Sequence, residues 1–163
     1  MNWDAIGAIG ELIGALAVVG SLVYLASQIH VSNLAAKQAS MRELMEEMTS
    51  FLGRLSASQE SANTWAIGLS QTRDLDEGEL SQFFIFCLEI TIVWERVYYL
   101  QKTVDVDDHL IHVIEANSRI IVNSPGYKRW FKAMRDQFTA EFRERIEQEM
   151  NKKVEFTPLK DRW

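Results

Sequence analysis

The sequence predicts an all-α protein in which one N-terminal transmembrane helix continues into a cytoplasmic helical bundle. Residues 5–27 hold one charged side chain in 23 positions. Later segments place apolar residues three and four positions apart, the period of an amphipathic helix, and none shows the alternation typical of a half-buried strand. We divide the chain into a transmembrane helix (1–30), a stalk or first bundle helix (31–55), a helical bundle (56–150) and a loose tail (151–163).

The apolar segment is long enough to cross a membrane. A helix of 23 residues is about 35 Å long, and the hydrocarbon core of a bilayer is about 30 Å thick. Trp3 and Tyr24 lie near its two ends, as interfacial aromatic residues do. Because apolar residues cover every face, a buried helix of a soluble protein is disfavoured. The acidic start MNWD and the lack of a small-x-small cleavage site disfavour a signal peptide.

The distribution of charge sets the orientation. Residues 1–30 contain no Lys or Arg, whereas Lys37 and Arg42 follow the apolar segment closely. The positive-inside rule then places residues 31–163 in the cytoplasm. All 17 basic and 21 of the 23 acidic residues lie there, a net charge of −4, so we expect no nucleic-acid partner. Cys87 is the only cysteine, which fits a reducing compartment and rules out an internal disulfide.

A stripe of small residues runs along the apolar segment, which we name the small-residue stripe. Its residues are spaced three and four positions apart, as at the interface of a left-handed helix pair, and their small side chains let two backbones approach closely. We therefore expect a homo-oligomer that packs through Gly7, Gly10, Gly14, Ala17 and Ser21.

Glu11 flanks the small-residue stripe near the start of the apolar segment. Three interpretations stay open for its carboxyl group. It extends to the outer interface, or it is protonated and hydrogen-bonded across an oligomer seam, or it lines a polar pore. Extension to the interface costs the least free energy, because the residue lies near the membrane edge.

The segment after the membrane continues with helical periodicity to about Leu55, and the polar residues 56–64 predict a break. Asp74 with Glu77 resembles a capping box at the start of the apolar segment 83–100. Three charges in that segment disfavour a second membrane span, so we expect a central helix buried by its neighbours.

Two further helices complete the predicted bundle. One has Asp105 as a candidate N-cap. The other begins with Ser124 as N-cap and Pro125 at the first helical position, where a missing N–H costs nothing. Its apolar residues continue at helical spacing to Met150, which predicts one uninterrupted helix.

The search for catalytic or metal-binding motifs yields polar candidates only. His112 and Glu115 form a single H-x-x-E, the reverse of the E-x-x-H of di-iron bundles, and are more typical of a solvated face. Glu89, Glu95 and Arg96 lie on the most apolar helix, where we favour an internal ion pair over a ligand pocket and expect the partner of Arg96 on another helix. We predict no catalytic residue, metal or cofactor, and the sequence favours a non-enzymatic role.

Two stretches resemble a group of small uncharacterised bacterial proteins. These begin with a W-[DE]-A-I-G-A-I-G-E-like membrane segment and end in an S-P-G…W…F helix, as in WDAIGAIGELIGALAVVGSLVYLASQI at 3–29 and SPGYKRWF at 124–131. The resemblance implies a single-pass protein of the bacterial inner membrane with a helical cytoplasmic part, and it supplies no activity.

Together these features predict a membrane-anchored, self-associating scaffold or interaction module. Its expected partners are the lipid bilayer, further copies of the chain and a protein partner. Two alternatives stay open. A small homo-oligomeric ion channel would have Glu11 near its pore, and a ligand- or metal-binding bundle would use Glu89, Glu95, Arg96 and His112.

Overall fold

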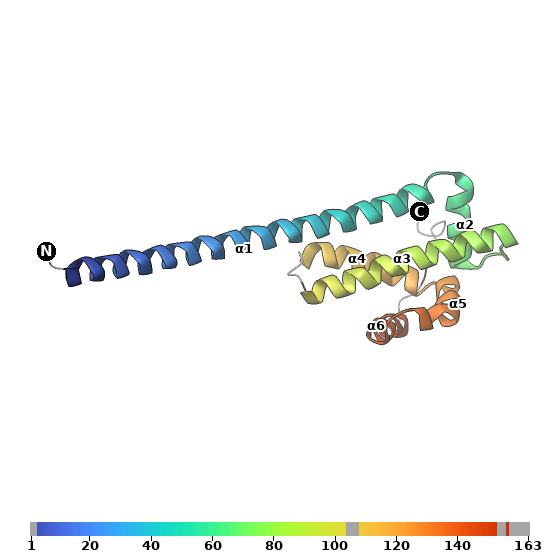
Figure 1. Ribbon diagram of the computed structural model, residues 1–163. Helices are drawn as coiled ribbons and strands as arrows, with labels where there is room; N and C mark the ends of the chain where they lie inside the picture. The colour runs from blue at the N-terminus through green and yellow to red at the C-terminus, as the bar shows by residue number, and fades with distance from the viewer. Residues whose placement is uncertain (1–2, 104–107, 153–155, 157–163) are drawn as a thin grey trace. The chain divides into compact units, whose positions relative to one another are not determined.

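All regular structure in the described residues is helical, which confirms the all-α prediction (Figure 1). The computed structural model describes residues 3–103, 108–152 and 156. The chain divides into two compact units, Met1–Glu43 and Leu44–Trp163. The elements are α1 (Trp3–Leu55), α2 (Gln59–Ser70), α3 (Glu77–Thr103), α4 (Asp108–Val122), α5 (Pro125–Met134), the short 3₁₀ helix η1 (Arg135–Gln137) and α6 (Ala140–Asn151).

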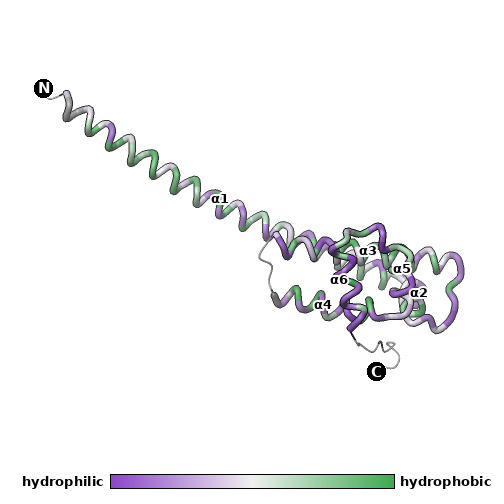
Figure 2. The backbone as a smooth tube through the Cα atoms, turned by 90° about the horizontal axis from the view of Figure 1, so that it is seen from below, coloured by the Kyte–Doolittle hydropathy of each residue, from purple (hydrophilic) through white to green (hydrophobic). Residues whose placement is uncertain are grey.

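Helix α1 runs without interruption for 53 residues, so the predicted continuation of the apolar segment as a helix is confirmed. No proline lies within it, and its glycines are not adjacent to one another. Hydrophobic residues predominate in its first part (Figure 2). It is the one helix of the described residues that is long and apolar enough to span a membrane.

The apolar side chains of the first unit lie at the surface. From residue 9 to residue 29, the large ones are between 54% and 65% exposed, and they point to every side of the helix. They are Ile9, Leu12, Ile13, Leu16, Val18, Val19, Leu22, Val23, Tyr24, Leu25 and Ile29.

Helix α3 supplies more of the core of the second unit than any other described helix, as predicted for a central buried helix. Its buried residues are Phe83, Phe86, Cys87, Ile90, Thr91, Val93, Trp94 and Val97. The last turns of α1 contribute Leu44 and Phe51, which are 1% and 2% exposed. The Phe51 ring meets Phe86 of α3 and Trp65 of α2 edge-on, with ring centroids 6.1 and 5.8 Å away.

The polar segment 56–64, expected to be a break, contains the start of α2. Ser58 is the N-cap of this helix, and its hydroxyl accepts a hydrogen bond from the backbone N–H of Ser61 at 3.0 Å. Such a cap satisfies one of the free N–H groups of a first turn. Of the polar residues that follow, Glu60 and Asn63 are exposed, whereas Ser61 and Thr64 are buried. The helix ends at Gln71, which adopts the left-handed conformation at φ 51°.

The start of α3 lies two residues later than the predicted capping box. The box is formed by Asp76 and Glu79, not by Asp74 and Glu77. The Asp76 carboxylate accepts from the Glu79 N–H at 2.9 Å, and the Glu79 carboxylate accepts from the Asp76 N–H at 3.0 Å. The sequence D-L-D-E-G-E offers both spacings, and only the second lets Glu79 also bind Arg73.

Helix α5 starts as predicted, with Ser124 as N-cap and Pro125 in its first turn. The Ser124 hydroxyl accepts from the Tyr127 N–H at 3.3 Å. Gly126 lies against the backbone of α2, because a Cβ added there would be 1.7 Å from the carbonyl oxygen of Gly68. The S-P-G sequence therefore combines a cap, a helix start and a close crossing of two helices.

The single helix predicted from Ser124 to Met150 is wrong, because the chain leaves the α-helix at Met134 and resumes at Ala140. Phe138 is extended, and its ring stacks on that of Phe131 with centroids 6.0 Å apart. In an unbroken helix, two residues seven positions apart are separated by about 10.5 Å along the axis. The interruption brings both phenyl rings into the same core.

The N-cap predicted at Asp105 and the loose tail predicted at 151–163 fall largely outside the described residues. Helix α4 begins at Asp108 and α6 ends at Asn151.

Candidate functional site

Two of the sequence candidates on α3 pair with the last turns of α1. Glu89 accepts from Arg54, with the Nε–Oε2 distance at 3.2 Å, and Arg96 donates to Glu47. The sequence predicts an acid from another helix as the partner of Arg96, and Glu47 is such an acid. These pairs are not internal, because their four side chains are 31% to 46% exposed. Ion pairs this exposed add at most about 1 kcal/mol each, so they align two helices and form no ligand pocket.

Glu95 caps a helix. Its Oε1 accepts from the backbone N–H of Thr139 at 2.9 Å and from the Thr139 hydroxyl at 2.7 Å. Thr139 is the N-cap of α6, whose free N–H groups favour a negative charge. The same hydroxyl accepts from Tyr99 at 2.8 Å, so the carboxylate and its surroundings are occupied by structural hydrogen bonds.

His112 is exposed on α4, and the structure does not join it to Glu115. Glu115 binds Arg145 at 3.1 Å and lies 3.9 Å from Arg119. Within the described ranges, no three His, Cys, Asp or Glu side chains are grouped as a metal ion would require. The candidates Glu89, Glu95, Arg96 and His112 therefore do not converge on one site.

A cluster of charges that sequence analysis missed surrounds Glu149, which is only 6% exposed. Its carboxylate lies 2.5 Å from Lys152, 3.3 Å from Arg119 and 3.4 Å from Arg145. Burial alone would raise the pKa of Glu149, but the Lys152 hydrogen bond and the three cations lower it. The i,i+4 spacing of Arg145 and Glu149 on α6 is the signal that sequence offered for this cluster.

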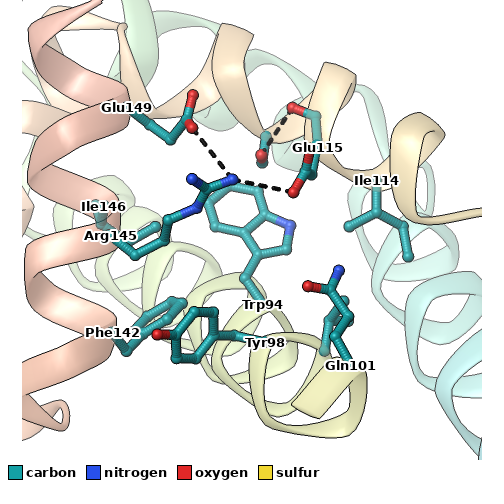
Figure 3. A pocket seen from close by; sticks show the side chains of 11 residues that line it. Trp94, Tyr98, Gln101, Ile114, Glu115, Phe142, Arg145, Ile146 and Glu149 are labelled. Carbon is teal, nitrogen blue, oxygen red and sulfur yellow. Dashed lines mark hydrogen bonds and ion pairs between the residues drawn. The ribbon is translucent and has the colours of Figure 1, made fainter. Parts of the chain in front are cut away.

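The Arg145 guanidinium reaches across the mouth of a small pocket between α3, α4 and α6 (Figure 3). The carboxylates of Glu115 and Glu149 bind the guanidinium from two sides. The Trp94 ring lies behind it in this view, and Phe142 and Tyr98 lie on the side away from the carboxylates. The pocket has a volume of about 60 Å³. Ligand sites usually enclose roughly 300–1,000 Å³, so this space admits water but no substrate.

Burial disfavours the ionised form of two potentially reactive side chains of the core. Cys87 is fully buried, and burial raises the pKa of its thiol far above neutrality. Thr91 donates to the Cys87 carbonyl at 2.6 Å, so Tyr127 is the donor in the 2.8 Å bond between their hydroxyls. Burial raises the pKa of Tyr127 strongly as well. This polar chain satisfies the one hydroxyl of a fully buried tyrosine.

All five residues of the small-residue stripe are exposed, and Glu11 is exposed beside them. A Cβ added at Gly7, Gly10 or Gly14 would meet nothing within 4 Å. Ser21 donates to the Ala17 carbonyl at 2.8 Å, so its hydroxyl is satisfied within the helix. The packing role of the stripe and the state of Glu11 stay predictions.

Comparisons with known proteins supply no identity. No family model matches the chain, and neither the curated proteins nor the solved structures contain a match. The resemblance to small bacterial membrane proteins therefore stays a prediction.

Proposed function

We propose that this protein is a membrane-anchored helical scaffold, in which the first part of α1 spans a bilayer and the second unit engages partners. The exposed apolar surface of α1 carries the proposal. Soluble monomers rarely expose apolar patches larger than a few hundred Å². Here every face of more than twenty consecutive residues is apolar and uncovered by its own chain.

The length of the segment fits this role. Gly7–Ile29 covers about 35 Å as a helix, enough for a hydrocarbon core of about 30 Å. Its backbone lies within the continuous helix α1, which provides the internal hydrogen bonds that a lipid environment requires. The resemblance to bacterial proteins supports the cytoplasmic membrane as its location, with residues 31–163 in the cytoplasm.

Charge substitutions test the membrane span. Leu16→Lys with Val19→Lys puts two cations at the centre of the segment, and Ala35→Lys with Gln38→Lys is the matched control at exposed positions outside it. The wild type and the control should stay with the membrane fraction after an alkaline carbonate wash, and the first variant should be lost from it. Release of the wild-type chain as a water-soluble monomer would contradict the proposal.

Self-association through the small-residue stripe is the second part of the proposal. Because Gly10 and Gly14 face open space, Leu at both positions causes no clash within the chain. The double substitution should reduce the oligomer size measured by light scattering in detergent. Ala8→Leu with Gly20→Leu, on other sides of the same helix, is the matched control and should leave the size unchanged. If the two variants formed oligomers of equal size, the small-residue stripe would not be part of the interface.

The cytoplasmic location is tested by labelling from outside. Ser56 is exposed between α1 and α2, whereas Cys87 is buried and provides an unreactive background. In intact cells, a membrane-impermeant maleimide should modify Ser56→Cys only after permeabilisation. Labelling before permeabilisation would place Ser56 outside the cytoplasm and contradict the proposed orientation.

A further inference from the structure

A cleft in the second unit is large enough for a ligand. It lies where the end of α2, the following loop, the start of α3 and one face of α5 meet, and its volume is about 500 Å³. That value falls within the range of small-molecule sites. Most of its wall is apolar and aromatic: Ile67, Leu75, Phe83, Phe84, Trp130 and Ala133.

The rim of the cleft carries a guanidinium that has no acidic partner among the described residues. The other arginines described between residues 44 and 152 each form an ion pair with a carboxylate. Arg129 is exposed at the rim and is the exception in this part of the chain. Arg73, also at the rim, is occupied by Glu79 through bonds of 2.5 and 2.7 Å. Arg129 is therefore the cation available to a bound anion.

A second polar group of the same wall lacks a partner. Trp130 is 7% exposed, and its indole Nε1 has no hydrogen-bond acceptor. An unsatisfied buried donor is destabilising, so native structures rarely retain one without a reason. Arg129 and Trp130 are consecutive residues of α5 that both line the cleft. An anionic group at the rim would meet Arg129, and the Trp130 indole N–H, which is buried in the same wall, would report its binding.

We infer that this cleft binds a small amphipathic monoanion, a carboxylate on an aromatic or branched apolar body. Arg129 matches a carboxylate in charge and in its bidentate geometry, and the aromatic wall accepts the apolar body. Asp74 lies on the same rim and opposes multiply charged anions such as phosphate esters. This binding site is independent of the membrane anchor and goes beyond the proposed scaffold.

Titration with 2-naphthoate tests the site, with neutral 2-naphthamide as the matched probe. The readout is the indole N–H spectrum of the full-length chain labelled with ¹⁵N-tryptophan, in which the Trp130 peak is assigned as the one lost in Trp130→Phe. Naphthoate should shift this peak saturably. Naphthamide should bind about tenfold more weakly or worse, because its neutral amide cannot form the charge-assisted bidentate pair that a carboxylate forms with Arg129.

Two cations of α5 supply the decisive comparison. Arg129→Gln should weaken naphthoate binding about tenfold and leave naphthamide unchanged. Lys132→Gln removes the same charge from an exposed residue outside the cleft and should leave both probes unchanged. Ala133→Leu, which fills the cleft, should weaken both probes. The inference is overturned if the Trp130 peak does not shift saturably, if both probes bind equally, or if the two Gln variants behave alike.

Discussion

One added methyl group at Gly126 tests how closely α2 and α5 pack. In Gly126→Ala, the new Cβ would lie 1.7 Å from the Gly68 carbonyl oxygen, 2.8 Å from its carbonyl carbon and 3.2 Å from the Leu69 Cα. Ordinary contacts begin near 3.4 Å, so the helices must separate by more than 1 Å. The obstacle is backbone and cannot rotate away. Overpacking costs about 1–3 kcal/mol, and this site belongs at the upper end.

The matched control is Gly53→Ala in α1, where an added Cβ meets nothing within 4 Å. Alanine should stabilise that helix by about 0.5–1 kcal/mol. Thermal unfolding of the full-length chain, followed by tryptophan fluorescence in one detergent, should show a Tm roughly 10 °C lower for Gly126→Ala. The Tm of the control should equal or exceed that of the wild type. Wild-type stability in Gly126→Ala would refute the close backbone crossing.

Three further experiments probe side-chain hydrogen bonds of the second unit by chemical or acid unfolding. Glu95→Ala should lower the free energy of unfolding by about 0.5–2 kcal/mol, because it removes the cap of α6. Adding Thr139→Ala to this variant should lower it by little more. If the effects of the two substitutions were fully additive, the two side chains would not interact. Thr91→Val strands the Tyr127 hydroxyl and should cost about 1–3 kcal/mol, part of which Tyr127→Phe restores; no restoration would contradict the bond. The pKa of Glu79 is lowered from 4.5 to about 2, so its contribution is complete above pH 4.5 and is lost as the pH falls to 2. Between pH 4.5 and 2, the free energy of unfolding of Glu79→Gln should therefore fall less steeply with decreasing pH than that of the wild type. Equal slopes for the two proteins would argue against the lowered pKa of Glu79.

Features governed by neighbouring residues were predictable from the sequence. The continuous α1 follows from its helical periodicity, and the start of α5 follows from Ser124 and Pro125, whose roles depend on the next three residues. The burial of the central helix follows from its apolar composition. Each of these needs only local pattern and propensity.

Features governed by distant residues were not predictable. The helix break before Ala140 depends on Glu95, which lies 44 positions away from Thr139 in the sequence. The cleft exists only because α2, α3 and α5 meet. The lack of an acidic partner for Arg129 emerges only from the positions of the other charges among the described residues. The polar residues of α3 were recognised as unusual, but their separate partners on α1 and α6 depend on the tertiary fold.

The crossing of Gly68 and Gly126 also offers a way to recognise distant relatives. An apolar N-terminal segment is common to countless membrane helices and discriminates poorly. In contrast, the Gly68 carbonyl leaves no room for a side chain at Gly126, 58 residues away, and the Phe83 ring occupies the place of one at Gly68. Homologous chains should therefore carry glycine at both places at once, and a paired glycine next to a capping serine would be a sharper fingerprint of this fold than overall similarity.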